Sequence, residues 1–279
     1  MQKHLVFIIL LLFVLSPCFS QEDKQEKMVY KSTMLGIGKA TVYDSYLSPV
    51  DYSGRSFGFM EESMKMTDLL NGNIASQQLF HIDFASTINN AGSSIQYAGF
   101  LDYSYGLHYK FNPLPALNIF AGSQINGVAG FIYNLRNSNN PATAKTHLNL
   151  TLSAAASYSF NIKSQPFRIR YQFTSPFVGM MFSPQFGQSY YEISLGNNDN
   201  LIHFSSYHNQ STMRNYLSLE VLIRALTLRL MYLNSIYETR INHIDTRICN
   251  NNFMIGFSKE LYIVSGKKEV KGNFNRVFE

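Results

Sequence analysis

The chain has 279 residues, a formal net charge of +5 and an aromatic content of 14%, with 18 Tyr and 22 Phe. Its small basic excess is spread along the sequence, which argues against a nucleic-acid-binding surface. The sequence contains no P-loop, nucleophile elbow, H-E-x-x-H helix or paired-cysteine motif. We therefore expect no nucleic-acid partner, no cofactor, no metal site and no catalytic residues.

The first twenty residues are typical of a secretory signal peptide. Lys3 precedes an apolar run from Leu5 to Leu15, and the small residue Ser20 comes directly before Gln21. Such a segment is removed on export, so we expect cleavage between Ser20 and Gln21; an uncleaved membrane anchor is the alternative. The mature chain then holds 22 basic against 18 acidic residues, a net charge of +4. It also keeps a single cysteine, so no intramolecular disulfide can form.

Apolar and polar residues alternate through much of the mature chain. In "HLNLTLSAAASYSFNI" (147–162), Leu148 through Ile162 form an apolar set and Asn149 through Asn161 a polar one. A period of two predicts a strand with two unlike faces, but strands of soluble sheets commonly have only about 5–6 residues. The same alternation runs through "FHIDFAS" (80–86), "IQYAGFLDYSYGLHYKF" (95–111), "FRIRYQFT" (167–174), "YYEISL" (190–195) and "NFMIGFSK" (252–259).

Two segments fit the alternation less simply. The stretch Leu117 to Tyr133 is noisier, because Phe120 and Val128 fall on its polar set. The stretch 217–233 contains three charged residues, which excludes a transmembrane helix. A hairpin with its turn at residues 224–225 would place Glu220 opposite Arg229 and put apolar pairs on the other face. An amphipathic helix with an i,i+4 pair of Glu220 and Arg224 is the alternative.

These patterns predict an all-β protein, a transmembrane antiparallel β-barrel of the outer-membrane type with about 12 strands, in a range of 10 to 14. A closed barrel satisfies its backbone hydrogen bonds inside lipid, whereas an open sheet does not. We expect a signal peptide at 1–20, a polar N-terminal segment at 21–32, the barrel at 33–264 and a charged tail at 265–279. The tail would lie in the periplasm or pair with the barrel.

The lengths of the predicted connections indicate an orientation. "FNPLPA" (111–116), "KSQP" (163–166), "LGNNDN" (195–200) and residues 224–225 are short. The connections at 135–145, 174–189 and 239–251 are mostly longer. Outer-membrane barrels have short periplasmic turns and longer outer loops, so both chain ends are expected in the periplasm. The long connection "MTDLLNGNIAS" (66–76) falls on the short side and does not fit this rule.

Two stretches resemble a family of secreted Bacteroidota outer-membrane barrels of uncharacterised function. They are "DSYLSPVDYSG" (44–54), which follows a "GIG" at 36–38, and "FSPQFGQSYYEI" (182–193). The signal peptide ending in "FSQ" is similar to those of the same organisms. The resemblance extends over the mature chain and implies an outer-membrane barrel, and it brings no catalytic residues with it.

Alternation also predicts which charged and polar side chains point into the lumen. They are His81, Asp83, Asp102, His108, Lys110, Arg168, Arg170, Glu192, Glu220 and Arg229. A turn centred near residues 91–92 would place His81 opposite Asp102. An imidazole between two carboxylates can serve as a base; the alternative is a hydrogen-bonded network that fills the lumen. The inward arginines would favour anionic solutes, or else cross-link a plugged barrel.

We therefore expect a porin-like protein of the outer membrane, either a narrow pore or a barrel that binds or transports a small solute. The alternatives are a hydrolase of lipid or peptide substrates at the barrel rim and a purely structural barrel. The expected partners are outer-membrane lipid and lipopolysaccharide, together with the barrel-assembly machinery that inserts such proteins.

Overall fold

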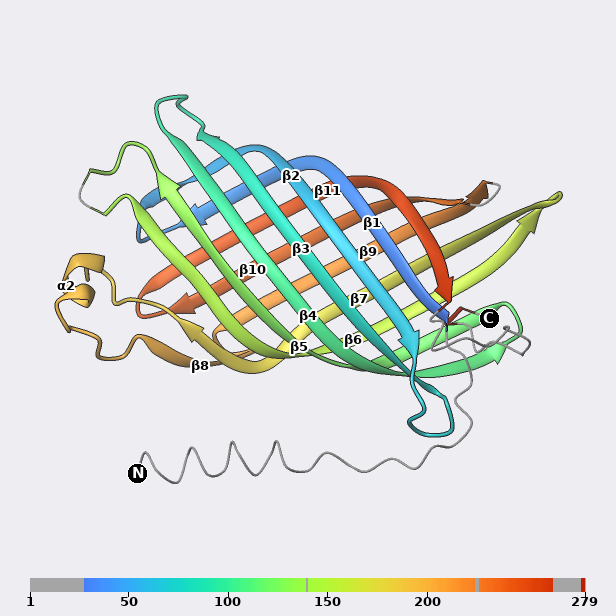
Figure 1. Ribbon diagram of the computed structural model, residues 1–279. Helices are drawn as coiled ribbons and strands as arrows, with labels where there is room; N and C mark the ends of the chain where they lie inside the picture. Colours follow the sequence, from blue (N-terminus) through green and yellow to red (C-terminus); the bar gives the residue numbers. More distant parts are fainter. Residues whose placement is uncertain (1–27, 139, 224–225, 263–276, 279) are drawn as a thin grey trace, which may run out of the picture.

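The computed structural model describes residues 28–138, 140–223, 226–262 and 277–278 (Figure 1). Within them the chain forms eleven strands and one short helix. The elements are β1 (Met28–Asp44), β2 (Ser48–Met66), β3 (Ile74–Asn89), β4 (Ile95–Leu114), β5 (Leu117–Asn134), β6 (Ala142–Ile162), β7 (Gln165–Phe182), α2 (Tyr190–Ser194), β8 (Ile202–Ser206), β9 (Gln210–Ile223), β10 (Leu226–Ile241) and β11 (Ile244–Tyr262).

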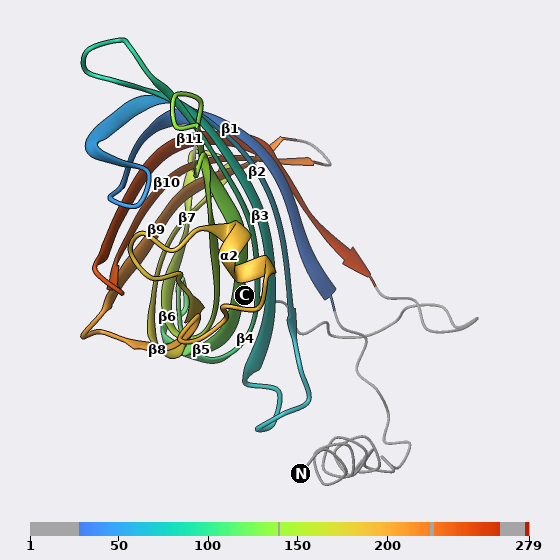
Figure 2. The ribbon, with the colours of Figure 1, turned by 90° about the vertical axis from the view of Figure 1, so that its left-hand side faces the viewer.

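Ten of the strands form a closed antiparallel barrel. Each of β1 to β6 pairs with the next strand, β7 pairs with β9, β9 with β10 and β10 with β11, and β11 closes the ring by pairing with β1. The short strand β8 pairs with the last five residues of β7 and lies outside this ring. Figure 2 shows the barrel from the end that carries α2. The predicted fold class is confirmed, with ten barrel strands where about twelve were expected.

The two faces of the barrel wall differ as the alternation predicts. On β6, Leu148 and Leu152 point outward and are 58% and 49% exposed, whereas Asn149 and Thr151 between them are buried inside. The outward set is apolar along most strands, and the inward set is largely polar. An apolar exterior around a polar interior is the pattern of outer-membrane barrels. Among the described residues, no helix is long and apolar enough to cross a membrane.

Two predicted strand registers are confirmed. In the hairpin of β9 and β10, Glu220 lies opposite Arg229, so the helix considered for residues 217–233 is wrong. Between β3 and β4, His81 lies opposite Asp102. A shift of one residue would exchange the two faces of a strand. It would turn the apolar side chains inward and the polar ones outward, which is why the alternation determines both registers.

The connections correct part of the predicted loop pattern. The terminal end, which we define as the barrel end with Met28 and Tyr262, carries the turns at 115–116 and 163–164 and the longer connection 67–73. The opposite end, the loop end, carries the connections 45–47, 90–94, 135–141, 183–201 and 242–243. "LGNNDN" therefore lies in a long connection at the loop end and is not a short turn at the terminal end.

Two of the long loops expected from the sequence are mostly strand. β7 continues to Phe182, so most of the segment 174–189 belongs to the barrel wall. The segment 239–251 contains a two-residue hairpin turn at Asn242 and His243, whose φ angles are 54° and 62°. Two-residue hairpin turns commonly need positive φ at both positions, and Asn adopts it at little cost.

Glu192 does not point into the lumen, and the strand expected at 190–195 is wrong. This segment begins helix α2, because Ser189 and Glu192 form a capping box. The Ser189 hydroxyl accepts a hydrogen bond from the Glu192 backbone N–H at 3.1 Å, and the Glu192 carboxylate accepts one from the Ser189 N–H at 2.7 Å. That second bond lowers the pKa of Glu192. The alternation in "YYEISL" is therefore incidental.

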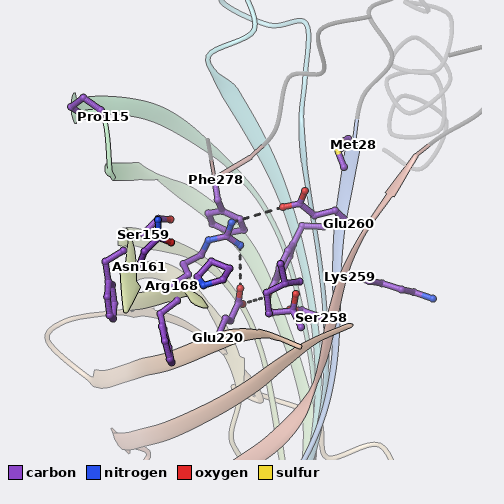
Figure 3. Close-up of a pocket in the computed structure, with 16 residues that line it drawn as sticks. Met28, Pro115, Ser159, Asn161, Arg168, Glu220, Ser258, Lys259, Glu260 and Phe278 are labelled. Atoms are coloured by element: carbon purple, nitrogen blue, oxygen red, sulfur yellow. Dashed lines mark hydrogen bonds and ion pairs between the residues drawn. The ribbon is translucent and has the colours of Figure 1, made fainter. Parts of the chain in front are cut away.

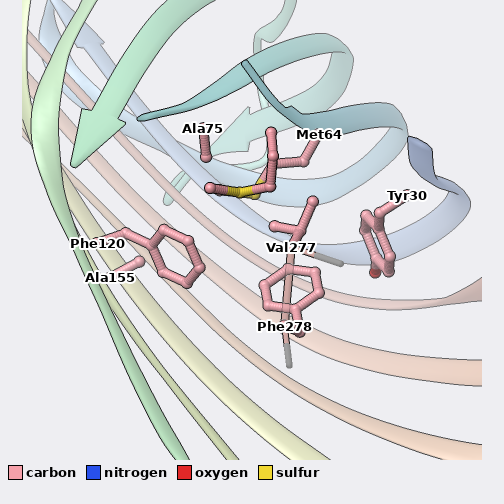
Figure 4. Close-up of a cluster of buried hydrophobic side chains, with 8 residues drawn as sticks. Tyr30, Met64, Ala75, Phe120, Ala155, Val277 and Phe278 are labelled. Carbon is pink, nitrogen blue, oxygen red and sulfur yellow. The ribbon is translucent and has the colours of Figure 1, made fainter. Parts of the chain in front are cut away.

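The barrel begins earlier than expected and its charged tail is described only at the end. β1 starts at Met28, so residues 28–32 are part of the wall and not of a separate polar segment. The signal peptide, its cleavage site and residues 21–27 lie outside the described residues, as do the last two residues of the predicted barrel (263–264) and residues 265–276 and 279 of the tail. Val277 and Phe278 are described, and they lie inside the barrel at its terminal end (Figure 4).

Candidate functional site

Three clusters of buried apolar side chains occupy the barrel interior at successive depths. β1 contributes Tyr30 to the first, Met34 to the second and Ala40 to the third, which orders them along the barrel. The terminal cluster holds Tyr30, Met64, Met66, Ala75, Phe120, Ala155, Val277 and Phe278. The middle cluster holds Met34, Met60, Leu79, Tyr216, Met231, Leu233 and Met254. The outer cluster holds Ala40, Val42, Leu47, Ala85, Ala98, Ile132 and Ile248.

These clusters explain the noisy alternation of β5. Phe120 is fully buried in the terminal cluster, and Val128 is buried beside the outer one. Both side chains point inward because the interior is packed with apolar as well as polar groups. Apolar residues on the inward set of β5 are therefore a feature of the sequence that indicates a filled lumen.

Three ion pairs cross the lumen from one wall to another, and each of their carboxylates is buried. They join Glu62 on β2 to Arg170 on β7 at 2.7 Å, Asp44 on β1 to Lys145 on β6, and Asp102 on β4 to Arg214 on β9. In the ring of ten strands, β2 and β7 are five places apart, as are β1 and β6, and β4 and β9 are four places apart. Side chains from opposite walls therefore meet at three depths.

The pair nearest the terminal end belongs to a larger arginine–glutamate layer. Glu62 also contacts Arg229 at 2.6 Å, and Glu220 contacts Arg168 at 3.1 Å and Arg229 at 3.5 Å. Gln77 adds a hydrogen bond to Glu62 at 2.5 Å. Apart from Arg168, whose side chain is 20% exposed, the charged groups of this layer are only 3% exposed. Buried charges in proteins are paired in this way, because a buried charge without a partner is strongly destabilising.

Four of the residues that were predicted to lie in the lumen belong to this layer: Arg168, Arg170, Glu220 and Arg229. Glu62, which binds two of these arginines, was not predicted. Glu62 lies between Met60 and Met64 on the inward side of β2. Its parity could have identified it, since an acidic residue on the inward set needs a basic partner.

The predicted cluster of His81, Asp83 and Asp102 is buried deeper in the barrel. Asp102 is neutralised by Arg214, which the sequence analysis missed, and accepts a hydrogen bond from Asn126 at 2.8 Å. His81 faces Asp102 across the strand pair, yet among the described residues its Nε2 atom has no hydrogen-bond partner. The imidazole therefore does not bridge two carboxylates as the sequence suggested.

Asp83 is held separately from Asp102. Its carboxylate accepts hydrogen bonds from the side-chain amides of Asn250 and, at 3.4 Å, Asn252. The cavity that Asp83 and His81 line lies between the middle and outer clusters and has a volume of about 50 Å³. This volume suits about one or two water molecules, whereas a lipid or peptide would need several hundred Å³. The remaining predicted residues, His108 and Lys110, are buried on the inward face of β4.

A much larger pocket opens at the terminal end of the barrel. This mouth pocket has a volume of about 650 Å³ and is drawn in Figure 3. Arg168 stands at its centre, bound to Glu220 and, at 3.9 Å, to Glu260. Its lining also includes Tyr30 and Phe278. It combines charged groups with aromatic surface, as sites for small molecules do.

The Phe278 ring sits in a socket of aromatic rings and guanidinium groups. Tyr30 and Phe120 meet it edge-on, with ring centroids 5.1 Å and 5.8 Å away (Figure 4). The Cζ atoms of Arg168 and Arg170 lie 4.6 Å and 5.3 Å from the centroid of the ring. We call these four residues the aromatic socket. Pairing of the tail with the barrel was one of two expectations, but the sequence did not predict that the Phe278 ring would enter the lumen.

The family of the chain follows from a comparison with family models. The model described as a protein of unknown function (DUF3316) matches residues 5–268. The chain belongs to the DUF3316 family. The expected membership in a family of unknown function is thereby confirmed, and the Bacteroidota origin stays a prediction.

Solved outer-membrane proteins are similar to this DUF3316 chain over most of its length. The transport unit of the autotransporter AIDA-I from Escherichia coli shares 9% identity, with a TM-score of 0.45, over 92% of this chain and 97% of that one. An outer-membrane channel from Pseudomonas putida F1 shares 6%, with a TM-score of 0.34, over 88% and 98%. The outer-membrane protease OmpT from Escherichia coli shares 10%, with a TM-score of 0.35, over 88% and 99%. No curated protein matches the chain.

Proposed function

We propose that this protein is an outer-membrane barrel that binds a small solute in its mouth pocket and does not form an open pore. The observation that carries the proposal is the set of ion pairs that cross the lumen, Asp44–Lys145, Glu62–Arg170 and Asp102–Arg214. A barrel of ten strands is narrow enough for side chains to fill. Together with the three apolar clusters, these pairs leave a cavity of only about 50 Å³ between the middle and outer clusters, among the described residues.

The outer-membrane location rests on the barrel wall. Its outward side chains are apolar along most strands, and ring closure leaves no unpaired strand edge among the ten barrel strands. Lipid is the medium that suits such a surface. On this proposal the protein contacts outer-membrane lipid and lipopolysaccharide and is inserted by the barrel-assembly machinery. The proposal also includes export by a signal peptide that is cleaved between Ser20 and Gln21, and an origin of the protein in the Bacteroidota.

The mouth pocket has room for a solute. Its volume of about 650 Å³ is within the range of small-molecule sites, roughly 300–1,000 Å³. The cluster of His81 and Asp102 does not line it, so a hydrolase built on that cluster has no access to a substrate there. We therefore favour binding over hydrolysis.

Planar-bilayer recordings of the refolded protein test whether the barrel is closed. We expect no stepwise conductance, although the inserted protein migrates on a gel with the heat-dependent shift of a folded barrel. Steady conductance steps from the parent protein would overturn the closed-barrel proposal in favour of the pore. Recovery of the protein from the soluble periplasmic fraction, instead of the outer membrane, would overturn the proposed location.

A further inference from the structure

We propose that the aromatic socket is a binding site for an aromatic residue of an amino-acid derivative or short peptide, and that Phe278 is its tethered occupant. This inference rests on the proposed solute-binding role of the mouth pocket and names the class of ligand. It follows from the way in which the socket binds Phe278, a side chain that is far from the socket residues in the sequence and is not part of the barrel wall.

The contacts of Phe278 show which chemistry the socket recognises. Two edge-on rings and two guanidinium groups surround its ring. Cationic groups are attracted to the face of an aromatic ring, an attraction that a saturated ring lacks. The backbone carbonyl of Phe278 also accepts a hydrogen bond from the Asn118 side-chain amide at 3.2 Å. The socket thus recognises a ring and an adjacent carbonyl, which are the two parts of an acylated aromatic amino acid.

Arg168 is held ready for this contact by the wall of the barrel. Glu220 and Glu260 bind its two terminal nitrogens, at 3.1 Å and 3.9 Å, which fixes its guanidinium group beside the ring (Figure 3). It is also the most exposed of the arginines in its layer and lines the mouth pocket. The free volume of the pocket therefore adjoins the socket, and the rest of a ligand can extend into it.

A tethered occupant competes with any free ligand. Because Phe278 belongs to the same chain, its local concentration at the socket is set by the tether and not by the solution. If its ring occupies the socket about nine-tenths of the time, the apparent Kd of a free ligand rises about tenfold. Removal of the ring should restore the intrinsic affinity.

The occupancy of the socket can be measured with a single fluorescent residue. The chain contains no tryptophan, so Phe278→Trp introduces the only one. We expect its emission to be protected from acrylamide, whereas that of Tyr191→Trp, at a residue 72% exposed in α2, should be quenched readily. Equal quenching in the two folded variants would show that residue 278 does not occupy the socket and would overturn the inference.

The ligand class is tested with N-acetyl-phenylalanine amide as the probe and its cyclohexylalanine analogue as the matched saturated control. We expect the aromatic probe to bind about tenfold more tightly to Phe278→Ala than to the parent, and to increase the quenching of Phe278→Trp. Arg168→Gln in the Phe278→Ala background should reduce the preference for the aromatic probe. Equal binding to Phe278→Ala and the parent, or equal binding of both probes, would overturn the inference.

The same preparations separate this inference from the proposed function. Gel mobility reports whether each variant is folded, and conductance of the parent reports whether the barrel is closed. A closed barrel with a protected tryptophan and no probe binding to Phe278→Ala contradicts the ligand class alone. Conductance steps contradict the closed barrel whatever the probes do.

Discussion

In the arginine–glutamate layer, Glu62→Gln should destabilise the barrel more than the corresponding change Glu220→Gln. Glu62 is bound by Arg170 at 2.7 Å and Arg229 at 2.6 Å, and all three side chains are 3% exposed. The substitution keeps the size of the side chain but removes the charge. Arg170 then has no carboxylate within ion-pair distance among the described residues, whereas Arg229 keeps Glu220 at 3.5 Å. Removing one partner of a buried pair costs about 3–5 kcal/mol.

Unfolding in urea, followed in detergent micelles or lipid vesicles, measures this loss. Glu61→Gln is the matched control, because Glu61 is the neighbouring residue on the exposed, outward face of β2. It should not lower the free energy of unfolding, because removing a charge from the lipid-facing side of the wall carries no cost. The double variant Glu62→Gln/Arg170→Gln removes both charges, and we expect it to be more stable than Glu62→Gln alone. Equal losses from Glu62→Gln and Glu61→Gln would refute the buried, bridged lumen.

The remaining predictions concern the wall, the deeper charges and the loop end. Leu150→Arg should cost about 2–4 kcal/mol if the residue lies near the bilayer midplane, and Ile162→Arg at the strand end about 0–1 kcal/mol; equal costs in urea unfolding would contradict the lipid-facing wall. Arg214→Gln should lower the free energy of unfolding by about 3–5 kcal/mol because it strands a buried carboxylate, and by more than His81→Ala, which removes no ion pair; the opposite order would refute the assignment. Burial, helped by neighbouring Tyr190 and Asp44, raises the pKa of Tyr46 to about 12. Because its folded pKa lies above the unfolded value near 10, its contact with the Gln188 carbonyl should persist below pH 10 and be lost toward pH 12; a titration centred near 10 in an ultraviolet difference spectrum against Tyr46→Phe would contradict this.

Local rules predicted the wall of the barrel well. A period of two places each side chain on one face, and a hairpin turn then determines which residues face each other. This is why the pairs His81–Asp102 and Glu220–Arg229 followed from the sequence. The same parity placed Arg170 and Asp83 inside. The inward position predicted for Glu192 was wrong. The segment "YYEISL" has the period of a strand, but the capping box formed with Ser189 favours a helix there.

The contents of the lumen could not be predicted in the same way. Which side chains meet across a barrel depends on the strand number and the stagger of the sheet, and neither is encoded in a short window. Arg214 is thus the partner of Asp102 although 112 positions separate them in the printed sequence. Phe278 was unpredictable for a further reason, because it belongs to no strand and its place depends on the socket that the barrel presents.

The three ion pairs that cross the lumen are sorted by sign along the chain. Their acids lie on β1, β2 and β4, and their bases lie on β6, β7 and β9. As the sheet curls, an acidic first half therefore approaches a basic second half, and attraction between the halves favours ring closure over an open sheet. Until closure, most buried inward charges within each half have the same sign and repel one another, with Lys110 on β4 and Glu220 on β9 as exceptions. Folding of this barrel should consequently be cooperative, with the last strand pairing and the pairing of the buried charges completed in the same step.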